Sequence, residues 1–104
     1  MSNYEPLSEE NIYLTENFII NNECRKIQPS LSLNDMEYAQ TIYDKIKKMP
    51  ITSYIQFGCT AYGMSSYGFY KAKNNEIYII KAYMNTITTY YNIDDCSFIK
   101  KNEK

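Results

Sequence analysis

The placement of tyrosine constrains the fold of this chain more than any other feature of its sequence. Eight of the twelve tyrosines lie between residues 54 and 91. Tyrosine favours strands, where its ring provides a large, rigid contact area and its hydroxyl tolerates water. This part of the chain therefore predicts a sheet with an aromatic surface, which suits binding. The eight residues are Tyr54, Tyr62, Tyr67, Tyr70, Tyr78, Tyr83, Tyr90 and Tyr91.

The absence of histidine limits the chemistry that the chain can perform. Histidine is the commonest general base and metal ligand, and the 104 residues contain none. Cys24, Cys59 and Cys96 are too far apart for the paired ligands of a zinc site. We therefore expect no catalytic residue, no metal and no cofactor, and each cysteine to be buried and structural. An enzyme acting through Cys59 is the least favoured function, because a thiolate needs a base or a positive field.

Nothing in the sequence indicates export or a membrane span. The first residues lack the basic, apolar character of a signal peptide, and no apolar run approaches the ~20 residues that cross a bilayer. An odd number of widely spaced cysteines also differs from the disulfide framework of small secreted domains. We therefore expect a cytoplasmic protein. Its abundant Lys, Asn, Ile and Tyr have AT-rich codons, as in many bacteria, phages and some eukaryotic parasites and viruses. A phage-encoded chain would act in the host cytoplasm.

The charges are divided unevenly along the chain. Residues 1–44 carry eight acidic and two basic residues, a net charge of −6, whereas residues 45–104 carry nine lysines and four acids, a net charge of +5. Such asymmetry can steer a charged partner towards one surface. It can equally reflect two halves that neutralise each other within the fold.

The clearest local pattern predicts a helix from Asp35 to about Met49. Asn34 is a suitable N-cap, Glu37 completes a capping box, and Pro50 ends the helix. Leu33 is expected to pack on Tyr38 as a hydrophobic staple. Apolar residues recur at helical spacing along one side. They are Met36, Ala39, Ile42, Tyr43, Ile46 and Met49.

The first segment is less decisive. Ser8 is a suitable N-cap for a helix over about residues 8–22, with Leu7 and Ile12 as its staple. Residues 12–20 are also compatible with an extended segment. We favour the helix.

After Pro50 the hydrophobic period changes from helical spacing to two. Apolar and polar residues alternate over residues 51–57, and residues 67–73 and 76–84 form the strongest strand pair. Residues 87–93 are a further strand, which should pair antiparallel with its predecessor. Asn74 and Asn75 suit a two-residue hairpin turn. That turn predicts the pairs Phe69–Ile80, Tyr70–Ile79 and Lys71–Tyr78.

These elements predict one α+β domain over residues 1–99, in which two N-terminal helices pack on one face of a three- to four-stranded antiparallel sheet. Residues 100–104 are expected to form a frayed tail. The hairpin is apolar on both sides, and a single helix layer covers only one of them. The uncovered tyrosines would then form a docking surface or a contact for self-association. The alternative is that they half-bury within the sheet without binding anything.

The favoured function is a non-enzymatic protein-binding module that inhibits or regulates another protein. In size and composition the chain is similar, in general terms, to phage anti-defence inhibitors such as anti-CRISPR proteins and to toxin-immunity proteins. The expected partner is a nucleic-acid-binding enzyme or a second copy of the chain. The alternative is a single-stranded nucleic-acid binder that stacks bases on sheet tyrosines beside Lys71, Lys73 and Lys81; the scarcity of arginine disfavours it. The expected partner-binding residues are Tyr54, Tyr67, Tyr70, Tyr78, Tyr83, Tyr90, Glu9, Glu10 and Glu16.

Overall fold

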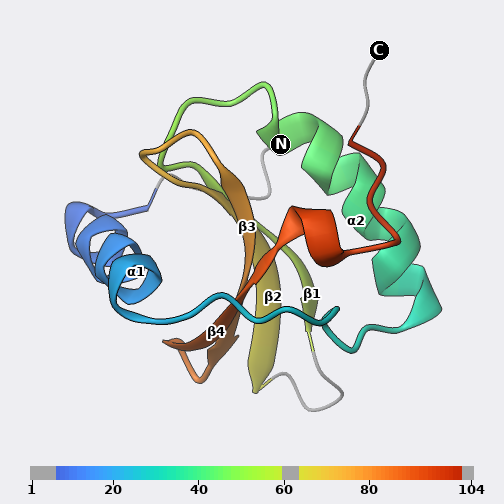
Figure 1. The fold of residues 1–104 in the computed structure, drawn as a ribbon, viewed down its shortest axis with the longest axis horizontal. Helices are drawn as coiled ribbons and strands as arrows, with labels where there is room; N and C mark the ends of the chain where they lie inside the picture. Colours follow the sequence, from blue (N-terminus) through green and yellow to red (C-terminus); the bar gives the residue numbers. More distant parts are fainter. Residues whose placement is uncertain (1–6, 60–63, 102–104) are drawn as a thin grey trace.

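The chain folds into two α-helices and a four-stranded antiparallel sheet, in a computed structural model that describes residues 7–59 and 64–101. The strands follow one another as a meander in the order β1-β2-β3-β4, shown in Figure 1. The α+β class and the antiparallel sheet predicted from the sequence are thereby confirmed. The elements are α1 (Glu9–Asn21), α2 (Leu33–Ile46), β1 (Tyr54–Cys59), β2 (Ser65–Lys71), β3 (Ile77–Tyr83), β4 (Thr86–Asn92) and the 3-10 helix η1 (Ile93–Asp95).

The two helices lie on opposite faces of the sheet, and this arrangement replaces the predicted placement of both on one face (Figure 1). The face towards α2 carries the larger apolar cluster, which includes Phe57 and Phe69. The face towards α1 carries a second cluster around Tyr70 and Ile80. Because both faces of the β2–β3 hairpin are apolar, each face needs its own cover, and the two helices provide it.

The chain passes from one face to the other around the edge of β4. Residues 22–32 connect α1 to α2, and Arg25 forms an isolated parallel bridge with Tyr91. The backbone N–H of Arg25 donates to the carbonyl of Tyr90 at 2.9 Å. This contact occupies part of an edge that would otherwise be open to pairing with another strand.

The β2–β3 register differs by one residue from the prediction. Phe69 pairs with Ile79 and Tyr70 with Tyr78, because the turn contains three residues rather than two. The N–H of Ala72 donates to the carbonyl of Glu76 at 2.8 Å, which leaves residues 73–75 as the loop, and Asn75 adopts a positive φ of 74°. A shift of one residue exchanges side chains between faces. Tyr78 and Ile80 therefore share the α1 side with Tyr70.

Both helix starts are explained by serine caps. The Ser8 hydroxyl accepts from the N–H of Asn11 at 3.1 Å, so the first segment is the helix that the sequence favoured. In α2 the cap is Ser32, which accepts from the N–H of Asp35, and the helix begins two residues before the predicted Asp35. With this earlier start Leu33 is exposed, as is Tyr38, and the predicted staple is not formed.

The end of α2 is closed by a lysine from the sheet. The helix ends at Ile46, and residues 47–49 continue as a turn towards Pro50. Lys71 Nζ donates to the carbonyls of Lys47 and Met49 at 2.8 Å each. The first bond satisfies the C-cap carbonyl, which has no partner within the helix, and the second holds the turn that follows.

The predicted C-terminal tail begins with an ordered contact. Lys100 exchanges two hydrogen bonds with the Gln40 side chain of α2, at 2.7 and 3.1 Å. The remainder of the tail, residues 102–104, lies outside the described residues.

Candidate functional site

Two tyrosine hydroxyls attach α1 to the sheet. The Tyr70 hydroxyl donates to Oε2 of Glu16 at 2.7 Å, and the same oxygen accepts the backbone N–H of Lys73 at 2.9 Å. The Tyr90 hydroxyl, near the end of the helix, donates to the carbonyls of Ile19 and Asn22 at 3.0 and 2.8 Å. Each ring is buried in the core, while each hydroxyl bonds the helix above it. The inward face of α1 is therefore fixed, and its opposite side faces solvent.

The environment of Tyr70 keeps its phenol neutral. Burial raises the pKa of Tyr70 well above its ordinary value, and the hydrogen bond to Glu16 and the negative charge of that carboxylate raise it further. A neutral phenol keeps the proton that it donates to Glu16. This arrangement makes Tyr70 a structural donor between layers.

Three predicted partner-binding tyrosines are core residues, which is a correction to the expected open face. Tyr67, Tyr70 and Tyr90 expose 3%, 0% and 6% of their surface, which leaves too little area for a partner to contact in the folded chain. The expectation of uncovered rings assumed a single helix layer. Because α1 and α2 cover opposite faces, these rings are buried on both faces of the sheet.

The other predicted tyrosines are separated from one another. Tyr54 and Tyr78 are half-buried on the α1 side, where the Tyr78 ring lies edge-on to Tyr90 with centroids 5.3 Å apart. Tyr83 is exposed at the end of β3, with its hydroxyl 3.8 Å from Sδ of Met64. Tyr62 lies outside the described residues. The structure therefore does not gather the predicted rings into one surface.

The predicted acidic residues divide into two groups. Glu9 and Glu10 are exposed in the first turn of α1, whereas Glu16 is partly buried and bound to Tyr70 and Lys73. Only the first two are therefore available to a partner. The sequence of α1 contains no lysine or arginine to offset their charge.

Large apolar side chains stand beside these two acids, and sequence reasoning missed them. Tyr13 and Ile20 are 67% and 75% exposed, and Leu14 is 51% exposed. Tyr13 and Ile20 are seven residues apart, close to two turns, and so lie on one line along the helix. We call Glu9, Glu10, Tyr13 and Ile20 the outer face of α1, with Leu14 at its margin. A helical projection of residues 9–21 places Tyr13 and Ile20 on the side opposite Thr15, the buried residue of the helix. The sequence therefore contains a pattern from which their exposure could have been predicted.

The lysines and tyrosines of the nucleic-acid alternative do not form a common surface. Lys71 is bound to two backbone carbonyls at the end of α2, and Lys81 lies over the ring of the buried Tyr67 at 5.6 Å from its centroid. Only Lys73 among the three is exposed. Base stacking needs rings that are open to solvent beside the cations.

The cysteines differ in their exposure, which corrects the expectation that all three are buried. Cys96 is buried, Cys24 is half-buried and Cys59 is exposed at the end of β1. Burial raises the pKa of Cys96 to about 11, and burial also raises that of Cys24; the negative charge of Asp95 acts in the same direction on both. The Gln56 side chain donates to Sγ of Cys59 at 3.0 Å.

Neither α1 nor α2 has the length and apolar character needed to cross a membrane. Within residues 7–59 and 64–101, no three cysteine or acidic side chains gather as metal ligands would.

The chain matches no protein-family model, no curated protein and no solved structure.

Proposed function

We propose that this chain is a non-enzymatic protein-binding module, which inhibits or regulates another protein by placing the outer face of α1 on a basic surface of that partner. The observation that carries the proposal is the composition of this face. Tyr13 and Ile20 are largely exposed beside Glu9 and Glu10, and no basic residue occurs in α1.

The two kinds of side chain on this face have complementary roles in binding. Tyr13 and Ile20 supply apolar area that is lost from water in a complex, and tyrosine is enriched among residues that dominate binding energy. Glu9 and Glu10 raise the rate of encounter with a positively charged partner and disfavour acidic ones. A second copy of the chain is therefore a poor partner for this face, because two acidic faces would repel each other.

A basic partner surface points towards proteins that bind nucleic acid. The outer face of α1 would occupy the positive channel of such an enzyme and exclude its nucleic acid. A small cytoplasmic protein acting in this way would be a phage anti-defence inhibitor, of which anti-CRISPR proteins are one kind, or a toxin-immunity protein. These classes are the ones that the size and composition of the chain suggest.

The test is affinity capture from extracts of the source cell, followed by mass spectrometry, with four forms of the protein. We expect the unmodified chain to retain a stoichiometric protein that is lost with Glu9→Lys/Glu10→Lys and with Tyr13→Ala/Ile20→Ala. The matched control is Glu37→Lys/Glu76→Lys, which changes the net charge equally at exposed positions outside α1. Melting temperatures of all forms establish that each is folded.

Two outcomes contradict the proposal. Retention of the same protein by both α1 variants would show that binding occurs elsewhere on the chain. Recovery of nucleic acid without a stoichiometric protein, with an affinity that falls steeply as salt increases, would favour the single-stranded nucleic-acid binder instead.

A further inference from the structure

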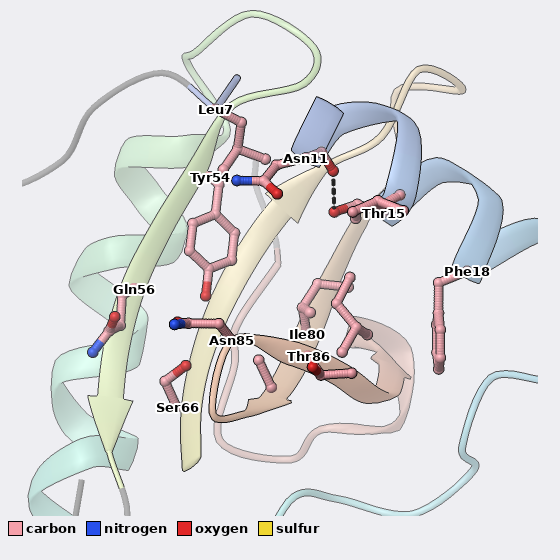
Figure 2. A pocket seen from close by; sticks show the side chains of 13 residues that line it. Leu7, Asn11, Thr15, Phe18, Tyr54, Gln56, Ser66, Ile80, Asn85 and Thr86 are labelled. Carbon is pink, nitrogen blue, oxygen red and sulfur yellow. Dashed lines mark hydrogen bonds between the residues drawn. The ribbon is translucent and has the colours of Figure 1, made fainter. Parts of the chain in front are cut away.

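A pocket of about 440 Å³ lies between the N-terminal half of α1 and the sheet. Its walls come from α1, from all four strands and from the turn between β3 and β4 (Figure 2). Leu14 belongs both to this wall and to the margin of the outer face of α1. The pocket therefore adjoins the proposed docking surface, and its volume lies in the range of small-ligand sites.

The floor of the pocket depends on a close approach between two residues. The Tyr54 ring lies across Gly68 of the neighbouring strand, so that a Cβ at position 68 would stand 2.3 Å from Cζ and from the hydroxyl oxygen of Tyr54. Ser66 lines the pocket beside the Tyr54 ring (Figure 2). Burial raises the pKa of Tyr54, so its phenol keeps its proton. The Tyr54 ring thus forms part of the pocket floor, and its hydroxyl is uncharged.

The lining has two parts. Aliphatic and aromatic side chains form one part, with Ile80, Ala82 and Ile87 on the sheet and Phe18 on the helix. Polar side chains form the other part and include two amides, Asn11 on the helix and Asn85 in the turn, both labelled in Figure 2. Neither amide makes a hydrogen bond to another described residue, so each has donors and an acceptor available.

The chemistry of this lining selects an uncharged ligand. No lysine, arginine, aspartate or glutamate is among the described residues that line the pocket. A charged group placed there would lose part of its hydration without gaining an opposite charge. An apolar side chain of a ligand would instead pack on the aliphatic part of the lining and leave water. A neutral amide of the ligand would form hydrogen bonds with Asn11 and Asn85.

We propose that this pocket binds an uncharged apolar side chain of a peptide together with the backbone amide beside it. The proposal rests on the proposed function: the peptide is a segment of the partner that docks on the outer face of α1, and the bound side chain is its anchor. Basic residues of the same partner would face Glu9 and Glu10, on the other side of Leu14. The expected recognition sequence is thus a leucine-like anchor flanked by lysine or arginine.

The test uses N-acetyl-leucinamide, an uncharged probe with one apolar side chain and two amides, titrated into the isotope-labelled full chain and followed by NMR. We expect saturable shifts at the backbone amides of Leu14, Ser66, Ala82 and Ile87, with a Kd on the order of 1–10 mM for so small a ligand. N-acetyl-leucine, which replaces the terminal amide by a carboxylate, is the matched control and should bind roughly tenfold more weakly.

Two variants assign the binding to the pocket. Ala82→Phe fills the space next to Ile80, and we expect it to abolish the saturable shifts. Asn85→Gly removes one amide and suits the positive φ of 70° at this position, and we expect it to weaken binding roughly three- to tenfold while the fold is kept. Unchanged binding in both variants, equal binding of N-acetyl-leucine, or no saturable shift would overturn the proposal.

The two proposals fail in different experiments. Because Glu9 and Glu10 do not line the pocket, Glu9→Lys/Glu10→Lys should bind N-acetyl-leucinamide as the unmodified chain does. Missing probe shifts would therefore contradict the pocket alone. A capture experiment insensitive to the α1 variants would contradict the docking face alone.

Discussion

The hydroxyl of Tyr70 donates a hydrogen bond of 2.7 Å to Glu16, although the two residues are 54 positions apart. Tyr70 is the largest fully buried side chain in the described part of the chain, and Glu16 lies on the helix above it. The pair shows how this chain uses tyrosine, with the ring as core and the hydroxyl as a donor to the next layer. Tyr90 repeats the arrangement at the end of α1.

Removing the Tyr70 hydroxyl should lower the free energy of unfolding by about 1.5–3 kcal/mol, the usual range for a hydrogen bond to a charged group. The change is Tyr70→Phe, which keeps the ring and leaves Glu16 with the Lys73 N–H alone. Urea denaturation measures the difference. Tyr83→Phe is the control, because this hydroxyl is exposed and should contribute little. Equal stability of the two variants would contradict the role assigned to the Tyr70–Glu16 bond.

Stability should fall at alkaline pH through the buried phenols. The pKa of Tyr70 in the folded chain is raised above the ordinary 10.0, and burial raises the pKa of Tyr67 and Tyr90 in the same direction. Because folding favours the neutral form, their contribution is complete below pH 10 and is lost as pH rises towards the raised values. Urea midpoints measured between about pH 8 and 11 should decrease only in the upper part of this range. Tyr70→Phe should make that decrease shallower, and an unchanged profile would argue against the raised pKa.

Gly68→Ala should destabilise the fold by roughly 1–3 kcal/mol, as overpacking does elsewhere. The added Cβ would meet the Tyr54 ring at 2.3 Å. Gly58→Ala is the matched control on the neighbouring strand: its Cβ would meet the carboxylate of Asp35 at 3.0 Å, and the end of that side chain can move. Combining Gly68→Ala with Tyr54→Ala should cost less than the sum of the two changes, because the clash disappears with the ring. Additive costs would mean that the two residues are not in contact.

The three thiols should react with a small aromatic disulfide reagent in the order Cys59, Cys24, Cys96. Cys59 is exposed, Cys24 is half-buried with a raised pKa, and Cys96 is buried with a pKa raised to about 11. Reaction needs both access and thiolate, and Cys96 lacks both near neutral pH. Absorbance of the released thiol in native and unfolded protein measures the order. Cys59→Ser should remove the fastest phase and leave the other two unchanged.

Local sequence patterns predicted the elements well because their causes are local. Ser8 caps α1 as predicted, and the tight turn between β3 and β4 falls at Met84 and Asn85, one residue earlier than the predicted gap between the strands 76–84 and 87–93. The β2–β3 register was missed because Asn75 can serve either a two-residue or a three-residue loop. That choice depends on the Ala72–Glu76 pair, which forms only within the sheet.

The candidate site was harder to predict, because exposure depends on which face each helix covers. A hairpin with two apolar faces can be covered in two ways. A helix layer can cover one face and a partner the other, or each face can have its own helix. The sequence of residues 22–32 does not reveal that the chain crosses the edge of β4 at Arg25. Once α1 lies on its own face, Tyr70 and Tyr90 become core, while Tyr13 and Ile20 turn outward. Glu9 and Glu10, expected from the sequence to bind a partner, are exposed in the first turn of α1, where carboxylates favour the helix.

The two helices bury different numbers of residues against the sheet. In α1 only Thr15 is buried, whereas α2 buries Ala39, Ile42, Tyr43 and Ile46. Helices with little buried area open at lower cost than the whole domain. Backbone amides of α1 should therefore exchange with deuterated solvent well before those of α2, and each such opening would transiently uncover the aromatic floor beneath the helix.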